Sequence, residues 1–410
     1  MALSVETGLF VADTADAVTT VSSSFQGKAI ILFGNPLTAS SSGDAGNAAF
    51  SYGFSDGTNH RCIAWAGDTG VGATNVGRSW RTDSALDILT DGTPTSARRI
   101  TGISFGATSF DITWDGTPAA AYRVGYMLLG GSDITNVIVG THTLDTATGP
   151  DSISGLAFQP NFGIFIHSMM TAAGTSVRAG GGIGFATSAT KEFAMAWNVD
   201  DAQTMAATFD SVGYVNAAAT MAAILDGAET VDLLADFTSW DSGGVTFNIS
   251  NAPTAAWQVG YLLIKGGQWD VGTANLAASP FSVTSMTFQP KGLFMGATNA
   301  TADATVTIHG ESTVGAAIST STEASISTLH SDVNDPTTTS KASLSTKILA
   351  NVFSGSGGEW DFTSLNSNGW TITVATTADG KDAGWFAMAD NAVAPTTTGS
   401  GWWGKAGNHW

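Results

Sequence analysis

Few residues in this sequence have the type and spacing that enzymatic or metal chemistry requires. The six histidines occur singly, and no pair has the spacing that places two zinc ligands on one face of a helix. We interpret them as exposed or hydrogen-bonded side chains of strands and loops: His60, His142, His167, His309, His330 and His409. Cys62 is the single cysteine, which excludes an intrachain disulfide and a cysteine-based zinc site. Within its apolar stretch we expect Cys62 to be a small buried side chain.

The carboxylates have a structural interpretation. Asp56, Asp91, Asp115 and Asp226 each precede a glycine, which is typical of tight turns in which the carboxylate accepts hydrogen bonds from the turn. A glycosidase would need two carboxyls about 5 to 9 Å apart, and the sequence neither identifies nor excludes such a pair. The glycine run at 180–184 precedes a strand-like segment where a dinucleotide-binding motif needs a helix, so we predict a turn there.

These observations predict no catalytic residue, no metal ligand and no cofactor, and we therefore expect a non-enzymatic protein. A calcium ion held by scattered loop oxygens is left open. The formal net charge is −19 and Lys plus Arg number only 15, without a basic cluster, which argues against nucleic-acid binding. The sequence has no apolar run long enough to span a membrane and no signal peptide at its start, so we expect synthesis in a cytoplasm.

The composition favours strands over helices. Only 12% of the 410 residues are charged and 49 are glycine, while Thr, Val, Ile, Phe and Trp form short runs between turn residues. Alternation of apolar and polar residues in 110–114, 245–249 and 370–374 predicts strands with one buried face. We expect Trp114, Phe247 and Trp370 to point into a core.

The same landmarks recur three times along the chain. A Phe-Gln pair precedes an apolar strand at Phe25, Phe158 and Phe288. Each of the first two copies continues with a hairpin, around 53–65 and 184–197, and ends in a Val-Gly-Tyr strand that contains Tyr126 or Tyr261. Sheets of short alternating strands need a second layer to cover their apolar face. We therefore predict an all-β fold of three tandem β-sandwich (jelly-roll-like) domains at 1–131, 132–267 and, degenerate, 268–390.

Residues 391–410 differ from the rest of the chain. A Thr/Gly/Ser-rich linker leads to Trp402, Trp403 and Trp410, three tryptophans that so short a peptide cannot bury alone. We consider them a candidate docking anchor, because tryptophan is enriched among interface anchors. Two alternatives stay open: the peptide folds back onto the third domain, or it docks into another subunit.

The Phe-Gln-Pro corners at 158–160 and 288–290, each leading into an apolar strand, and the later Ala196-Trp197 strand resemble a group of tailed-phage virion proteins. The first copy has Gly27 in place of proline. The resemblance implies a structural protein of a tailed phage, decorating the capsid or forming part of a head or tail fibre. It also implies other virion proteins as partners, with host surface polysaccharide and a homotrimer as further options. The alternatives are a bacterial surface adhesin or carbohydrate-binding protein and, third, a polysaccharide depolymerase.

Overall fold

The described parts of the chain form β-strands joined by turns and loops. The computed structural model describes residues 2–12, 14, 17–44, 46–116, 121–203, 211–224, 230–331, 338–350, 358–376 and 380–391. These residues form 33 strands and no helix, so the predicted all-β class is confirmed. The anchor residues Trp402, Trp403 and Trp410 lie outside the described residues.

The strand order repeats with a period of eleven strands, and we call each set of eleven a unit. The first unit comprises β1 (Leu3–Ala12), β2 (Val18–Ser22), β3 (Gly27–Asn35), β4 (Ser41–Asp44), β5 (Ala48–Ser55), β6 (His60–Gly67), β7 (Val76–Arg81), β8 (Leu86–Leu89), β9 (Ser96–Phe105), β10 (Ser109–Asp115) and β11 (Tyr122–Gly131). The second comprises β12 (Asn136–Thr143), β13 (Gly149–Ile153), β14 (Phe162–His167), β15 (Gly174–Val177), β16 (Ala179–Ser188), β17 (Lys191–Val199), β18 (Ser211–Asn216), β19 (Met221–Ile224), β20 (Val231–Asp241), β21 (Gly244–Asn251) and β22 (Gln258–Lys265). The third comprises β23 (Gln268–Asn275), β24 (Phe281–Val283), β25 (Gly292–Ala297), β26 (Thr307–Ile308), β27 (Gly310–Ser319), β28 (Thr322–His330), β29 (Thr339–Leu344), β30 (Leu349–Ala350), β31 (Glu359–Asn366), β32 (Gly369–Val374) and β33 (Asp382–Ala389).

Each unit is a sandwich of one large and one small antiparallel sheet. In the first unit the large sheet has the order β1-β11-β3-β5-β6-β7 and the small one β2-β10-β9-β8. The second and third units repeat both orders. The predicted hairpins are β5 with β6 and β16 with β17, which pair antiparallel along their lengths.

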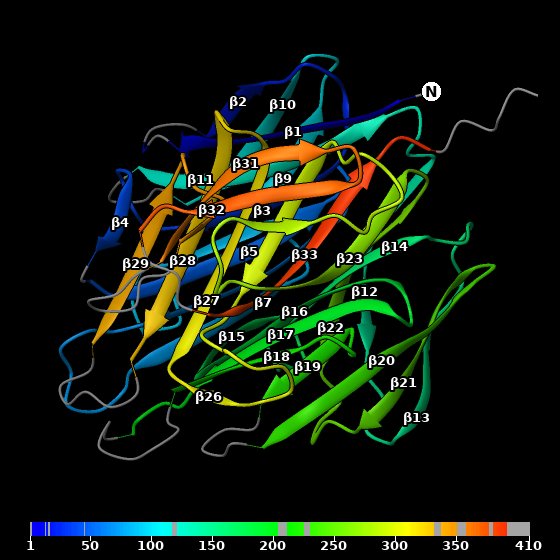
Figure 1. Ribbon diagram of the computed structural model, residues 1–410. Coiled ribbons are helices and arrows are strands. Elements are labelled where there is room, and N and C mark those ends of the chain that lie inside the picture. The colour runs from blue at the N-terminus through cyan, green and yellow to red at the C-terminus, as the bar shows by residue number, and fades with distance from the viewer. Residues whose placement is uncertain are drawn as a thin grey trace, which may run out of the picture.

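A seventh strand is added to every large sheet by the following unit. β15 of the second unit pairs with β7 of the first, and β26 of the third unit pairs with β18 of the second. β4 of the first unit pairs with β29 of the third, which closes the cycle. The three units are thus joined into a ring by exchange of short strands, and Figure 1 shows them, blue to cyan, green, and yellow to red, around a shared centre.

The inner strands of the large sheets are buried on both faces. One face packs against the small sheet of the same unit, as Ile30 and Leu32 of β3 do with Phe110 and Trp114 of β10. The other face joins a central core to which all three units contribute. In that core Phe33, Phe185 and Phe386 surround Phe294, with ring centroids 5.0 to 6.0 Å from its own. The small sheets alternate between buried and exposed residues, as β10 does, and have one face in water.

The predicted core aromatics are confirmed. Trp114 is 6% exposed, and Phe247 and Trp370 are fully buried, each in the sandwich core of its own unit. Tyr126 and Tyr261 lie directly opposite Gly8 and Gly140 on the neighbouring first strands, where their rings cover the glycines. Cys62 is buried, as expected.

The predicted turn at 180–184 is wrong, because these residues lie inside strand β16. A Cβ added at Gly184 would come 1.7 Å from the carbonyl oxygen of Thr220, just before β19. The same close approach recurs at Gly53 beneath Ala85 and at Gly315 beneath Ile348. These glycines are needed because the small sheet crosses the large one at backbone contact distance.

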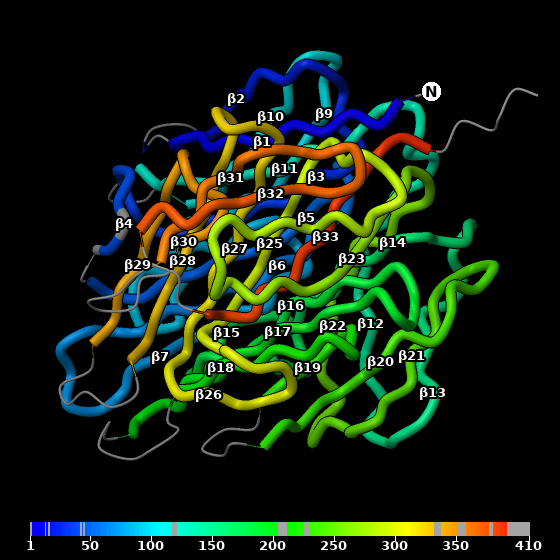
Figure 2. The backbone as a smooth tube through the Cα atoms, in the orientation of Figure 1, coloured from blue at the N-terminus to red at the C-terminus, as the bar shows by residue number. Residues whose placement is uncertain are grey.

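Both ends of the described chain lie at one end of the ring. Figure 2 shows the start of β1 beside the end of β33. Leu3 N–H donates to the Asp390 carboxylate at 2.7 Å, and Asn391 N–H donates to Asp133, in the connection between β11 and β12, at 2.7 Å.

Candidate functional site

The Phe-Gln corners have the same role in all three units. The side-chain amides of Gln26, Gln159 and Gln289 donate to the carbonyl oxygens of Phe105, Trp240 and Leu365, at 3.1, 2.6 and 3.3 Å. These acceptors lie at or near the ends of β9, β20 and β31, which are equivalent inner strands of the three small sheets. The glutamine therefore ties the entrance of the large sheet to the small sheet of its own unit.

The residue that follows each corner connects one unit to the next. Lys28 Nζ donates to the carbonyl of Ile134 at 2.6 Å, ahead of β12. Asn161 Nδ2 donates to the carbonyl of Gly267 at 3.0 Å, ahead of β23. Lys291 Nζ completes the cycle by donating to the carbonyl of Leu3 in β1 at 2.9 Å. We call these three meeting points the junctions.

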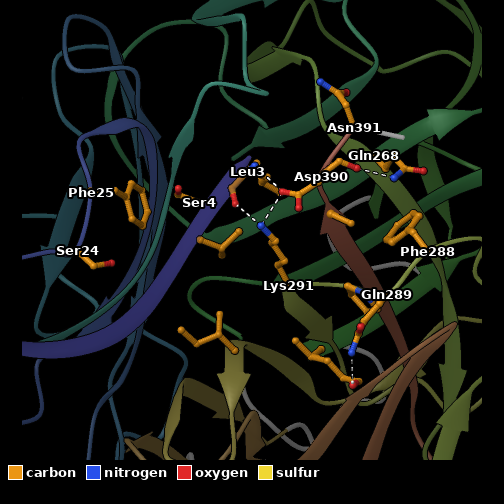
Figure 3. A pocket seen from close by; sticks show the side chains of 15 residues that line it. Leu3, Ser4, Ser24, Phe25, Gln268, Phe288, Gln289, Lys291, Asp390 and Asn391 are labelled. Atoms are coloured by element: carbon orange, nitrogen blue, oxygen red, sulfur yellow. Dashed lines mark hydrogen bonds and ion pairs between the residues drawn. The ribbon is translucent and has the colours of Figure 1, made fainter. Parts of the chain in front are cut away.

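The junction between the third and first units contains an open groove of about 800 Å³. Its walls include Val5, Phe25, Phe288, Gln289, Lys291 and Asp390. Figure 3 shows Phe25 and Phe288 on opposite sides, with Lys291 and Asp390 between them. Aromatic walls combined with a few polar groups are typical of binding sites, and this groove is our candidate functional site.

Charge in this groove is arranged around Asp390. Its carboxylate accepts from Lys291 Nζ at 2.6 Å and from the backbone N–H of Leu3. Partial burial raises the pKa of Asp390, but these hydrogen bonds outweigh burial, so the pKa lies below the ordinary value of 3.8. Asp390 therefore keeps its negative charge at neutral pH.

A second groove of about 770 Å³ lies at the junction of the first and second units. Its lining is more polar and includes Gln26, Lys28, Asp56 and Asn136. Asp56 accepts from Thr58 N–H and Asn59 N–H at 2.9 and 2.7 Å, as predicted for a turn aspartate. It also accepts from Val139 N–H of the second unit at 3.0 Å, so that it serves the junction as well.

The other residues singled out in the sequence are not brought together. His60 contacts Ser55, His142 contacts Asp151, and His167 contacts the carbonyl of Ala222. His330 is buried in another part of the molecule, and burial lowers the pKa of both His167 and His330 to about 4. Within the described ranges no three His, Cys, Asp or Glu side chains form a possible metal site. His409 and Asp226 lie outside those ranges.

Two buried carboxylates that the sequence analysis missed have structural partners. Glu323 accepts from Phe362 N–H at 3.0 Å, and Glu192 accepts from Phe237 N–H at 2.8 Å and from Thr220 Oγ1 at 2.6 Å. Both amides adjoin a bulge in the middle strand of the small sheet. Burial raises the pKa of Glu192, and it raises the pKa of Glu323 to about 7. These acids complete the hydrogen bonding of the bulges. The only signal for them in the sequence is an acidic residue directly before the apolar part of a strand, as in Glu192-Phe193 and Glu323-Ala324.

Comparison with known proteins does not add an identity. No protein-family model matches the chain, and no curated protein matches it significantly. The described part of the chain contains no helix that is long and apolar enough to cross a membrane.

Proposed function

We propose that this chain is a non-enzymatic structural protein of a tailed-phage virion, in which one polypeptide takes the place of a trimer. The observation that carries the proposal is the cyclic strand exchange through β4, β15 and β26, together with the core that all three units share. Such an arrangement is typical of symmetric oligomers, in which each subunit contacts the next in the same way. A chain of this form matches a threefold position on a particle.

The surface of the ring supports a structural role. Hydroxyl side chains on the outer faces of the small sheets of the second and third units bond to one another across strands, as Ser152 does with Thr246 and Ser282 with Thr371, both at 2.8 Å. With a net charge of −19, such polar faces favour solubility of the free protein before assembly. The partners in this proposal are other virion proteins of the capsid or tail.

The test is mass spectrometry of purified virions. The proposal predicts peptides of this chain at a constant copy number relative to the major capsid protein. A surface adhesin or carbohydrate-binding protein would be absent from particles and would bind specific sugars on a glycan array. A depolymerase would release reducing sugar from host capsule.

A further inference from the structure

The three junctions differ in the side chains that fill them. Leu129, Ile264 and Met388 are equivalent residues on the last strands of the three units, β11, β22 and β33, and each pairs with two neighbouring strands. On the third strand of the same unit they pair with Ala29, Phe162 and Gly292. On the first strand of the same unit they pair with Val5, Val137 and Trp269. Each junction combines the third-strand residue of one unit with the first-strand residue of the next.

The junction between the second and third units is filled by two aromatic rings. Phe162 and Trp269 stack with ring centroids 4.1 Å apart and planes at 4°. The indole N–H of Trp269 donates to the carbonyl of Gly266 at 2.7 Å. Phe386 of the central core packs against Phe162 at 4.9 Å. At this junction a tryptophan therefore fills the space between the two units.

The junction between the third and first units lacks both rings. Gly292 and Val5 occupy the positions of Phe162 and Trp269, and the open groove lies beside them. A Cβ added at Gly292 would come 3.0 Å from Val5 Cγ1 and from Met388 Sδ, so a side chain growing from this strand would require these neighbours to shift. An aromatic ring that comes from another segment can enter the open groove without this shift.

The C-terminal segment leaves the described structure at this groove. Asn391 lines it and is held by hydrogen bonds to Asp133. Ten residues lie between Asn391 and Trp402, which makes eleven steps from one Cα to the next. Such a linker spans up to about 36 Å when extended and about 18 Å on average when flexible. Tethering at this distance gives an effective concentration on the order of millimolar, which favours a site on the same chain.

We propose that a tryptophan of residues 402–410 occupies this groove in its own chain and closes the third junction as Trp269 closes the second. The indole ring packs between Phe25 and Phe288, whose side chains are half-buried in the groove walls. The Asp390 carboxylate and the backbone carbonyls of the walls are acceptors for the indole N–H, which usually finds a partner when buried. The proposal is independent of the virion function, since it concerns the free protein.

A binding experiment on full-length chains tests this proposal. The receiver is the full chain with Trp402→Ala, Trp403→Ala and Trp410→Ala, and the probe is a fluorescent peptide of residues 401–410. We expect the peptide to bind the receiver and to bind the wild-type chain at least tenfold more weakly, because the native segment already fills the groove. Adding Val5→Trp to the receiver should weaken peptide binding at least tenfold. Val137→Trp, the equivalent change at the first-to-second junction, is the matched control and should leave binding unchanged.

Several results would overturn the proposal: no peptide binding to the receiver, equal binding to the wild-type chain, or equal effects of Val5→Trp and Val137→Trp. Phe288→Ala removes one wall and provides a second variant if Val5→Trp fails to fold, as judged by its melting curve. Sedimentation then shows whether the native C-terminal segment docks in its own chain or in a second copy. We expect monomers for both the wild-type chain and the receiver, whereas dimers that need the three tryptophans would place the segment in a neighbouring copy and contradict docking in its own chain.

Discussion

Replacing Glu323 by glutamine should stabilise the protein at neutral and alkaline pH. Glu323 is 4% exposed, and its carboxylate accepts from Phe362 N–H at the bulge of β31. Burial raises its pKa to about 7, partly opposed by the Phe362 hydrogen bond and by Lys347 and reinforced by Asp361. Since the carbonyl oxygen of glutamine can accept the same hydrogen bond, Glu323→Gln keeps the bulge paired and removes only the charge.

The sign and size of the effect follow from the shifted pKa. A carboxyl with a raised pKa is more stable protonated in the folded state, so its contribution is fully present below about pH 4.5 and is lost as the pH rises to about 7. The interval from 4.5 to about 7 corresponds to about 3 kcal/mol, at about 1.4 kcal/mol for each pH unit. This value is an upper bound, because water and local relaxation reduce the cost of a buried charge.

Chemical denaturation of the wild-type chain and Glu323→Gln across pH 4 to 8.5 measures this effect. We expect equal unfolding free energies near pH 4 and a variant that is more stable by about 1 to 3 kcal/mol at pH 8. Glu192→Gln, in the equivalent place of the second unit, should change stability in the same direction. Glu323→Ala is the control for geometry: it removes the same charge but leaves Phe362 N–H without its acceptor, so it should be less stable than Glu323→Gln by about 1 to 3 kcal/mol at every pH. The reasoning would be refuted if the unfolding free energy of Glu323→Gln, compared with wild type at the same pH, fell between pH 4 and pH 8.

Two further substitutions test the packing. Trp114→Ala should destabilise the first unit by about 3 to 5 kcal/mol, because Trp114 is buried against Phe10 and Arg98 and donates to Thr19. An unchanged melting curve would show that this strand does not need the ring. Gly184→Ala should prevent close contact of β16 with the Thr220 carbonyl and lower the melting temperature strongly, whereas Gly72→Ala, whose added Cβ meets nothing within 4 Å, should change stability by less than about 0.5 kcal/mol. Equal melting temperatures for these two alanine variants would contradict the close crossing of the two sheets.

The sequence predicts the sandwich of each unit better than it predicts their assembly. Alternation in 110–114 correctly places Trp114, because one face of that strand is in water. The apolar run 29–33 has no alternation, which is typical of sheets buried on both faces, and this signal could have indicated the shared core. The exchanged strands β15 and β26 have no such signal, because segments of four and two residues are too short to show alternation and resemble loops until a neighbouring sheet edge pairs with them.

The candidate site was predicted only in part. The Phe-Gln corners were recognised as landmarks, and their amide hydrogen bonds explain why Gln follows Phe in each unit. The groove exists where Gly292 and Val5 take the places that Phe162 and Trp269 have at the junction between the second and third units. Recognising these pairs as equivalent requires the strand register of three separate sheets, which the sequence alone does not provide. The tryptophan anchor stays a prediction, since it lies outside the described residues.

The proposed virion role is tested most directly by quantitative mass spectrometry of density-purified particles. We predict peptides from all three units in the particle fraction, at a fixed ratio to the major capsid protein that is the same in independent preparations. Recovery of the chain only in the soluble fraction of the lysate, with none in the particles, would contradict a structural role in the virion.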